Sequence, residues 1–202
     1  MVASLQAHQL TCVRGGRVVF RDVSFRASAG EALAIEGANG SGKTSLLRMI
    51  AGFLAPQAGS IVLTRDGAEI SDGEERGKLV GWLGHQDGVK PQMTPAETLR
   101  FFSELYGIGA DTNAALDSVG LARAADLPCR YLSAGQKKRL ALARLKLSTR
   151  PLWLLDEPLS ALDTQGKALL RDLIERHCAS GGMVIAATHE PLDVDCARLV
   201  LA

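Results

Sequence analysis

The sequence predicts an α/β fold with a mostly parallel sheet and a small antiparallel β part. Short apolar runs alternate with helical stretches along most of the 202 residues, as expected when strands and helices alternate. The run Leu152–Leu155 is apolar at every position, which is typical of a parallel strand covered on both faces. We therefore expect one compact domain, residues 1–202, with a central parallel sheet.

The elements follow in order from apolar periodicity and from turn residues. Strands are expected at residues 18–25, 32–35, 60–64, 79–83, 152–155, 183–187 and 199–201, and helices at 43–51, 97–106, 112–119, 134–147 and 167–178. Asp66-Gly67 and Asp72-Gly73 are expected to form turns. Because strands are lacking in the middle of the chain, residues 87–148 are expected to form an inserted helical subdomain. Residues 1–86 and 149–202 then form the core.

Composition excludes several classes of protein. The formal net charge of +1 gives no electrostatic reason to expect nucleic-acid binding. The four cysteines are far apart in the sequence, which fits a reduced cytosolic chain better than a disulfide scaffold or a zinc site. No apolar run approaches the roughly 18 residues that a membrane helix needs, and the start lacks the features of a signal peptide. Any membrane contact is therefore expected only through partner chains.

Residues 37–44, GANGSGKT, match the pattern GxxxxGK[ST] between an expected strand and an expected helix. This context is typical of a P-loop nucleoside triphosphatase with a RecA-like core, in which backbone N–H groups converge on phosphates at a helix N-terminus. Lys43 would reach the β- and γ-phosphates of ATP, and the Thr44 hydroxyl would ligate Mg²⁺. The alternative is a glycine-rich turn with an accidental lysine. The expected nucleotide ligands here are Gly37, Ala38, Asn39, Gly40, Ser41, Gly42, Lys43, Thr44 and Ser45.

Two acids, Asp156 and Glu157, follow the apolar strand 152–155. Ligands of open α/β sheets bind at the carboxyl ends of the strands, so both acids are expected at the site. Asp156 could hold Mg²⁺, and Glu157 could act as general base toward an attacking water. The alternative is a strand that ends in two solvated acids.

Residues 132–136, LSAGQ, open the helix expected at 134–147. The segment resembles the signature of ABC ATPases, usually LSGGQ, with Ala134 in place of one glycine. It offers a second helix N-terminus for a phosphate, where Ser133 could donate and Gly135 would allow close backbone approach. A plain N-cap role for Ser133 stays open beside this one. The cationic run Lys137–Arg139 is expected to be a solvated helix face.

The resemblance to ABC ATPases implies an inserted ABC helical subdomain and a homodimer in which two subunits sandwich ATP. It extends to three further positions in the family's order: Gln86 as a catalytic residue that senses Mg²⁺ and water, residues 160–163 (SALD) as the D-loop, and His189 as the switch histidine. Taken locally, Gln86 could equally be an exposed loop residue and His189 a structural one. His8, His85 and His177 are expected to have no functional role.

One position departs from the family pattern. Where ABC ATPases stack an aromatic side chain on adenine, the sequence aligns Arg14. A guanidinium plane can also stack on a purine. A solvated loop arginine is the alternative.

Features that are less specific than the ATPase motifs resemble one subfamily, the cytochrome c biogenesis ATP-binding export proteins. These are GHQDGVK at residues 84–90, the helix start 94–99, the signature segment and the total length. The resemblance implies a translocase ATPase at the cytoplasmic face of the inner membrane. It would bind integral membrane permease subunits and energise haem export or release of a haem-loaded chaperone. A different ABC exporter, a soluble ABC regulator, and a P-loop kinase or GTPase are the alternatives.

Overall fold

The structure, a computed structural model, describes residues 2–84 and 88–201. Packing divides the chain into two units. The core unit comprises Met1–Trp82, Arg150–Glu157 and Ile174–Ala202, and the helical unit comprises Leu83–Thr149 and Pro158–Leu173. The functional division predicted at 87–148 stays a prediction.

The strands are β1 (Val2–Arg14), β2 (Arg17–Ser28), β3 (Ala32–Glu36), β4 (Ala58–Arg65), β5 (Ala68–Ile70), β6 (Val80–Leu83), β7 (Leu152–Asp156), β8 (Met183–Ala187) and β9 (Ala197–Val200). The helices are α1 (Lys43–Ile50), α2 (Gly73–Gly77), α3 (Pro95–Tyr106), α4 (Thr112–Asp117), α5 (Ala134–Leu147) and α6 (Thr164–Ala179), with short 3₁₀ turns at Ala122–Ala124 and Cys129–Tyr131.

Five strands form the central sheet in the order β6-β7-β8-β3-β9. β7 pairs with β8, β8 with β3, and β3 with β9, all in parallel. Every residue of β7 and β8 is buried, which explains their continuous apolar sequence. The predicted fold class, a mostly parallel α/β sheet with a separate antiparallel part, is confirmed.

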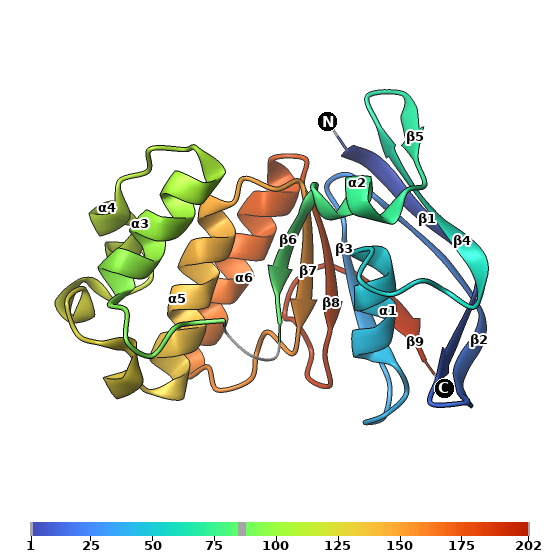
Figure 1. Cartoon of the computed structure of the whole chain (residues 1–202). Helices are drawn as coiled ribbons and strands as arrows, with labels where there is room; N and C mark the ends of the chain where they lie inside the picture. The colour runs from blue at the N-terminus through green and yellow to red at the C-terminus, as the bar shows by residue number, and fades with distance from the viewer. Residues whose placement is uncertain (1, 85–87, 202) are drawn as a thin grey trace. The chain divides into compact units, whose positions relative to one another are not determined.

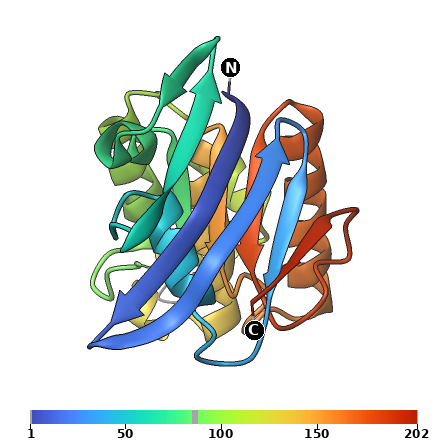
Figure 2. The same cartoon turned by 90° about the vertical axis from the view of Figure 1, so that its right-hand side faces the viewer.

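A second, antiparallel sheet has the order β2-β1-β4-β5. Figure 2 shows β1 and β2 as two long, curved neighbouring strands. β1 is not among the strands predicted from the sequence, because its alternation of buried and exposed residues is interrupted. Its pairing with β2 shifts register between Ala7 and Leu10, where Gln9 has a φ of 47°.

Helix α1 lies between the two sheets of the core unit (Figure 1). Its buried side chains Leu46, Leu47, Met49 and Ile50 join one apolar cluster with residues from β1, β3, β4, β7 and β8. Burial on two opposite sides fixes this helix, and with it the loop that precedes the helix, in the middle of the core unit.

In the helical unit, α3, α4 and α5 pack around a separate apolar cluster that includes Leu99, Leu116 and Leu140. Helix α3 begins with a reciprocal capping box between Thr94 and Glu97 and ends at Gly107, which has a φ of 67°. No helix in the described parts of the chain combines the length and the apolar character needed to cross a membrane.

The prediction of a turn at Asp72-Gly73 is wrong. Asp72 is the N-cap of α2, and its carboxylate accepts a hydrogen bond from the Glu75 N–H at 2.9 Å. The residues that favour turns also favour N-caps, so a five-residue helix cannot be distinguished from a turn by composition.

Candidate functional site

The loop between β3 and α1 requires glycine at two positions. Gly37 has a φ of 151°, and a Cβ there would lie 2.5 Å from the Leu201 carbonyl oxygen. Gly42 has a φ of 99°, and its Cβ would lie 2.6 Å from Val19. A side chain at either position would force the loop open, so the glycines keep its backbone tightly folded at the start of α1.

Lys43 lies across this loop. Its ammonium donates to the carbonyl oxygens of Gly37 at 2.8 Å and Ala38 at 3.3 Å, and the residue is 7% exposed. The Ser41 hydroxyl is buried and has no hydrogen-bond partner among the described residues. A buried hydroxyl beside a buried cation at a helix N-terminus fits an anionic ligand such as phosphate.

The carboxyl ends of β3, β8 and β7 meet in the centre of the sheet. Ala187 at the end of β8 is the register partner of both Ile35 and Asp156. Thr44 Oγ1 donates to Asp156 Oδ1 at 2.9 Å and lies 3.0 Å from Oδ2. A hydroxyl and a carboxylate are hard oxygen ligands of the kind that Mg²⁺ prefers, so the residues present fit this ion.

Glu157 follows Asp156 in a left-handed conformation with a φ of 49°, and its N–H donates to the Ala187 carbonyl at 2.9 Å. Its Oε2 lies 2.6 Å from Nδ1 of His189, the second residue after β8. The Glu157 side chain is 18% exposed, whereas that of His189 is 56% exposed. Strained backbone and a charge-assisted contact at the end of a central strand are typical of a functional site.

A pocket of about 450 Å³ opens over the loop. Its walls include Asn39, Lys43, Ser45, Glu157 and Arg14. Arg14 is the last residue of β1 and is exposed, so it belongs to a hairpin strand rather than to a loop. The structure thus places Arg14, the P-loop and Glu157 around one pocket within the core unit.

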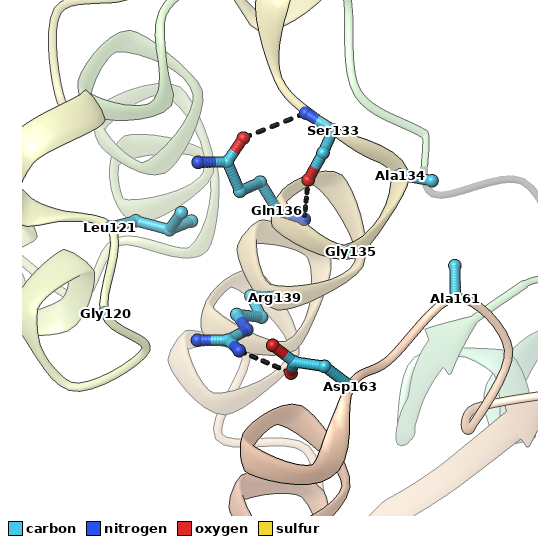
Figure 3. A pocket seen from close by; sticks show the side chains of 9 residues that line it. All are labelled: Gly120, Leu121, Ser133, Ala134, Gly135, Gln136, Arg139, Ala161 and Asp163. Atoms are coloured by element: carbon cyan, nitrogen blue, oxygen red, sulfur yellow. Dashed lines mark hydrogen bonds and ion pairs between the residues drawn. The ribbon is translucent and has the colours of Figure 1, made fainter.

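The signature segment lies in the helical unit. Ser133 is the N-cap of α5: its Oγ accepts from the Gln136 N–H at 3.2 Å, and Gln136 Oε1 accepts from the Ser133 N–H at 2.9 Å (Figure 3). The N-cap interpretation of Ser133 is therefore confirmed locally. A Cβ on Gly135 would lie 2.9 Å from the Ala161 carbonyl oxygen, which explains glycine at this position.

A second pocket, of about 710 Å³, is lined by the signature segment together with Gly120, Arg139, Ala161 and Asp163 (Figure 3). Arg139 and Asp163 form an ion pair at 2.6 Å across its wall. The Gly166 N–H and the Arg139 guanidinium lower the pKa of the Asp163 carboxyl.

The cationic run Lys137–Arg139 differs from its prediction. The prediction of a solvated face for Lys137–Arg139 is wrong, because Lys138 is 2% exposed and the Arg139 side chain 18%. Lys138 lies on the same buried face of α5 as Ala141, Leu142 and Leu145. The helical spacing of these residues in the sequence could therefore have predicted that Lys138 is buried. Gln86 and His85 lie outside the described residues.

His177 has a packing role. Its ring stacks on Trp153 with centroids 3.9 Å apart and planes at 8°. Burial lowers the pKa of this imidazole. A Cβ on Gly182 would lie 2.3 Å from His177 Nε2, so glycine makes room for the ring.

Comparison with known proteins identifies the family. Residues 20–160 match the ABC transporter family. The cytochrome c biogenesis ATP-binding export protein CcmA of Rhodopseudomonas palustris strain BisB5 is 52% identical over 191 residues, which cover 94% of each chain. The protein of the same name from Bradyrhizobium diazoefficiens is 47% identical over 196 residues and 96% of each chain.

Solved structures agree on the fold. A Pyrococcus furiosus chain assigned to the ATP-binding proteins of ABC transporters superposes with a TM-score of 0.85 at 24% identity over 98% of both chains. A bacterial Atm1-family ABC exporter, solved with ATP bound, gives a TM-score of 0.82 at 25% identity over 100% of this chain and 37% of the exporter. This chain therefore belongs to the ABC transporter family of ATP-binding proteins and, within it, to the cytochrome c biogenesis ATP-binding export proteins.

Proposed function

We propose that this chain hydrolyses Mg-ATP as a homodimer that sandwiches two nucleotides, and thereby energises an export step of cytochrome c biogenesis. The observation that carries the proposal is the convergence of Lys43, Thr44, Asp156, Glu157 and His189 at the carboxyl ends of three adjacent strands. Binding and hydrolysis of a nucleoside triphosphate need such a set: a cation and backbone donors for phosphates, oxygen ligands, and a base.

Each residue of the core unit would have a distinct role. Lys43 would exchange the carbonyl oxygens of Gly37 and Ala38 for phosphate oxygens. Thr44 and Asp156 would hold Mg²⁺, which would offset the charge that develops on the phosphates. Glu157 would accept the proton of the attacking water, and His189 would hold the carboxylate in place and contact the γ-phosphate.

The second half of each site would come from the other copy. The Ser133 hydroxyl and the N-terminus of α5 can face a phosphate, because a helix N-terminus carries partial positive charge. Gly135 allows close backbone approach. Gln86, together with Thr44 and Asp156, completes the proposed set of Mg²⁺ ligands, and it is proposed to link the site to the helical unit.

The names of the relatives describe export proteins of cytochrome c biogenesis. We therefore propose integral membrane permease subunits as partners and a peripheral position at the cytoplasmic face of the inner membrane. The cargo expected from the sequence, haem or a haem-loaded chaperone, would then be handled by the membrane subunits.

A membrane pull-down tests this function. The Glu157→Gln variant, held with ATP, is expected to retain polytopic membrane proteins together with cytochrome c maturation factors, identified by mass spectrometry. Lys43→Met, which should not hold ATP, is the matched control. Capture of an unrelated permease would overturn the cytochrome c assignment, and capture of no membrane protein would favour a soluble regulator.

Arg14 is proposed to stack on the base of the nucleotide, because it lines the same pocket as the P-loop residues. Arg14→Ala is expected to weaken binding of ATP and of GTP by about fivefold each, since stacking is not specific for one base. Inorganic triphosphate, which has no base, should bind both forms equally. Arg17→Ala in the same hairpin is the control for lost charge. Equal nucleotide affinities of the wild type and Arg14→Ala would exclude stacking.

A further inference from the structure

The segment that follows Glu157 packs on the beginning of α5. We propose that Arg139 is a positioning residue that, through Asp163, locks the segment 160–163 onto the signature segment, so that the chain that follows Glu157 is held as one rigid element with the beginning of α5. This inference rests on the proposed ATPase function, because it assigns a further residue to that reaction.

The first contact is the ion pair. Arg139 Nη2 lies 2.6 Å from Asp163 Oδ1, and the same oxygen accepts a hydrogen bond from the Gly166 N–H at 2.8 Å. Asp163 therefore does two things at once: it caps the start of α6 and it binds α5. The Arg139 side chain is 18% exposed and that of Asp163 is 66% exposed, so the guanidinium is held in place while the carboxylate stays open to solvent.

The second contact lies one turn earlier on the same face of α5. Gly135 and Arg139 are four residues apart, and the Ala161 carbonyl lies so close to Gly135 that a Cβ would be only 2.9 Å from it. Ala161 has a φ of 63°, a conformation that a non-glycine residue adopts only when its surroundings hold it. Together the two contacts hold the segment at Ala161 and at Asp163 (Figure 3).

The guanidinium is also confined on its other side. A Cβ on Gly120, in the turn after α4, would lie 3.4 Å from Arg139 Nη1. A planar, forked cation fits between this turn and Asp163, whereas a lysine would place one compact ammonium there. Arg139→Lys should therefore restore only part of the function.

The segment 160–163 follows Glu157 closely in the chain, so the contact between Arg139 and Asp163 can influence the proposed base. At Glu157 the chain leaves the core unit, and Pro158 is the first residue of the stretch Pro158–Leu173 that belongs to the helical unit. Loosening 160–163 would remove a restraint directly after the proposed base. The signature segment keeps its own capping box, so nucleotide contacts through Ser133 should persist. Arg139 is therefore expected to affect kcat more than KM.

A double-mutant cycle on ATP hydrolysis tests the coupling. Arg139→Met is expected to lower kcat about tenfold with KM within about twofold. Asp163→Asn keeps an oxygen for the Gly166 N–H, so it should preserve the start of α6 while losing the charge of the pair. The double variant should be no slower than Arg139→Met, and Arg139→Lys should recover part of the loss. The inference would be overturned if the double variant lost kcat by the product of the two single losses. A loss confined to KM would overturn it as well.

A second measurement does not depend on catalysis. In nucleotide-free protein, amide hydrogen exchange at residues 159–163 should be faster in Arg139→Met than in the wild type, with exchange at 133–136 unchanged. Arg123→Met, which removes an exposed cation of the helical unit, is the control. Unchanged exchange at 159–163 would contradict the positioning role. A wild-type chain without ATPase activity would refute the proposed function and leave this result to stand by itself.

Discussion

Glu157→Gln is expected to lower the rate of ATP hydrolysis by about 1,000-fold while leaving ATP affinity within about threefold. The amide keeps the size of the carboxylate and can still contact His189, whose Nδ1 lies 2.6 Å from Glu157 Oε2. It cannot accept a proton from water. The residues that would bind phosphates and Mg²⁺ remain unchanged, so the loss should fall on kcat. Phosphate release and nucleotide titration measure the two quantities separately.

The control for this variant is Glu104→Gln, which removes an exposed carboxylate from α3 of the helical unit and should hydrolyse ATP normally. ATP should also hold Glu157→Gln as a dimer in solution, since the nucleotides would be bound without turnover. Normal turnover by Glu157→Gln would remove Glu157 from the role of base. Lost ATP affinity would point instead to a collapsed site.

The sequence predicted the elements whose local pattern and tertiary environment agree. α5 was expected at 134–147 and is found at Ala134–Leu147, because Ser133 supplies an N-cap and the spacing is helical throughout. β8 was expected at 183–187 and is found at Met183–Ala187. A strand buried on both faces is apolar throughout, so its boundaries can be read from the ends of the apolar run.

What the sequence could not predict depends on irregular backbone or on long-range contacts. The bulge near Gln9 interrupts the alternating pattern by which β1 could have been predicted. At the start of α2, two residues that favour turns led to the prediction of a turn instead of a helix. The ion pair between Arg139 and Asp163 joins residues 24 apart, and no local pattern indicates it. The motifs named the candidate site residues, but only the parallel order of β7, β8 and β3 brings those of the core unit together.

Arg76 is such a long-range residue, and its removal should be the costliest change to stability. It is 5% exposed, and its guanidinium donates to the carbonyl oxygens of Met49, Ile50 and Ile61 at 3.2 to 3.3 Å, as well as to that of Ser71. Two of these carbonyls end α1, where a cation is favoured by the helix dipole. Burial lowers the pKa of this guanidinium.

Arg76→Met keeps most of the apolar stem but removes the guanidinium donor from these four carbonyl oxygens, of which that of Met49 still accepts from the Gly52 N–H. Relief of the buried charge offsets part of the loss, so the free energy of unfolding should fall by about 3 kcal/mol. Urea denaturation would show this as a lower midpoint with an unchanged slope. Lys78→Met, which removes an exposed cation at the end of the same short helix α2, should change stability by no more than about 0.5 kcal/mol. Equal midpoints for the two variants would contradict the role given to Arg76.

Added ATP separates an effect on stability from an effect on binding. A ligand at 100 times its Kd stabilises the folded state by about 2.7 kcal/mol, and at a fixed ligand concentration the increment depends only on affinity. Because α1 begins at Lys43 and Arg76 contacts its other end, the P-loop should remain intact in Arg76→Met. The same ATP concentration should then stabilise the wild type and Arg76→Met equally. A smaller increment in the variant would mean that the end of α1 also controls the shape of the phosphate-binding loop.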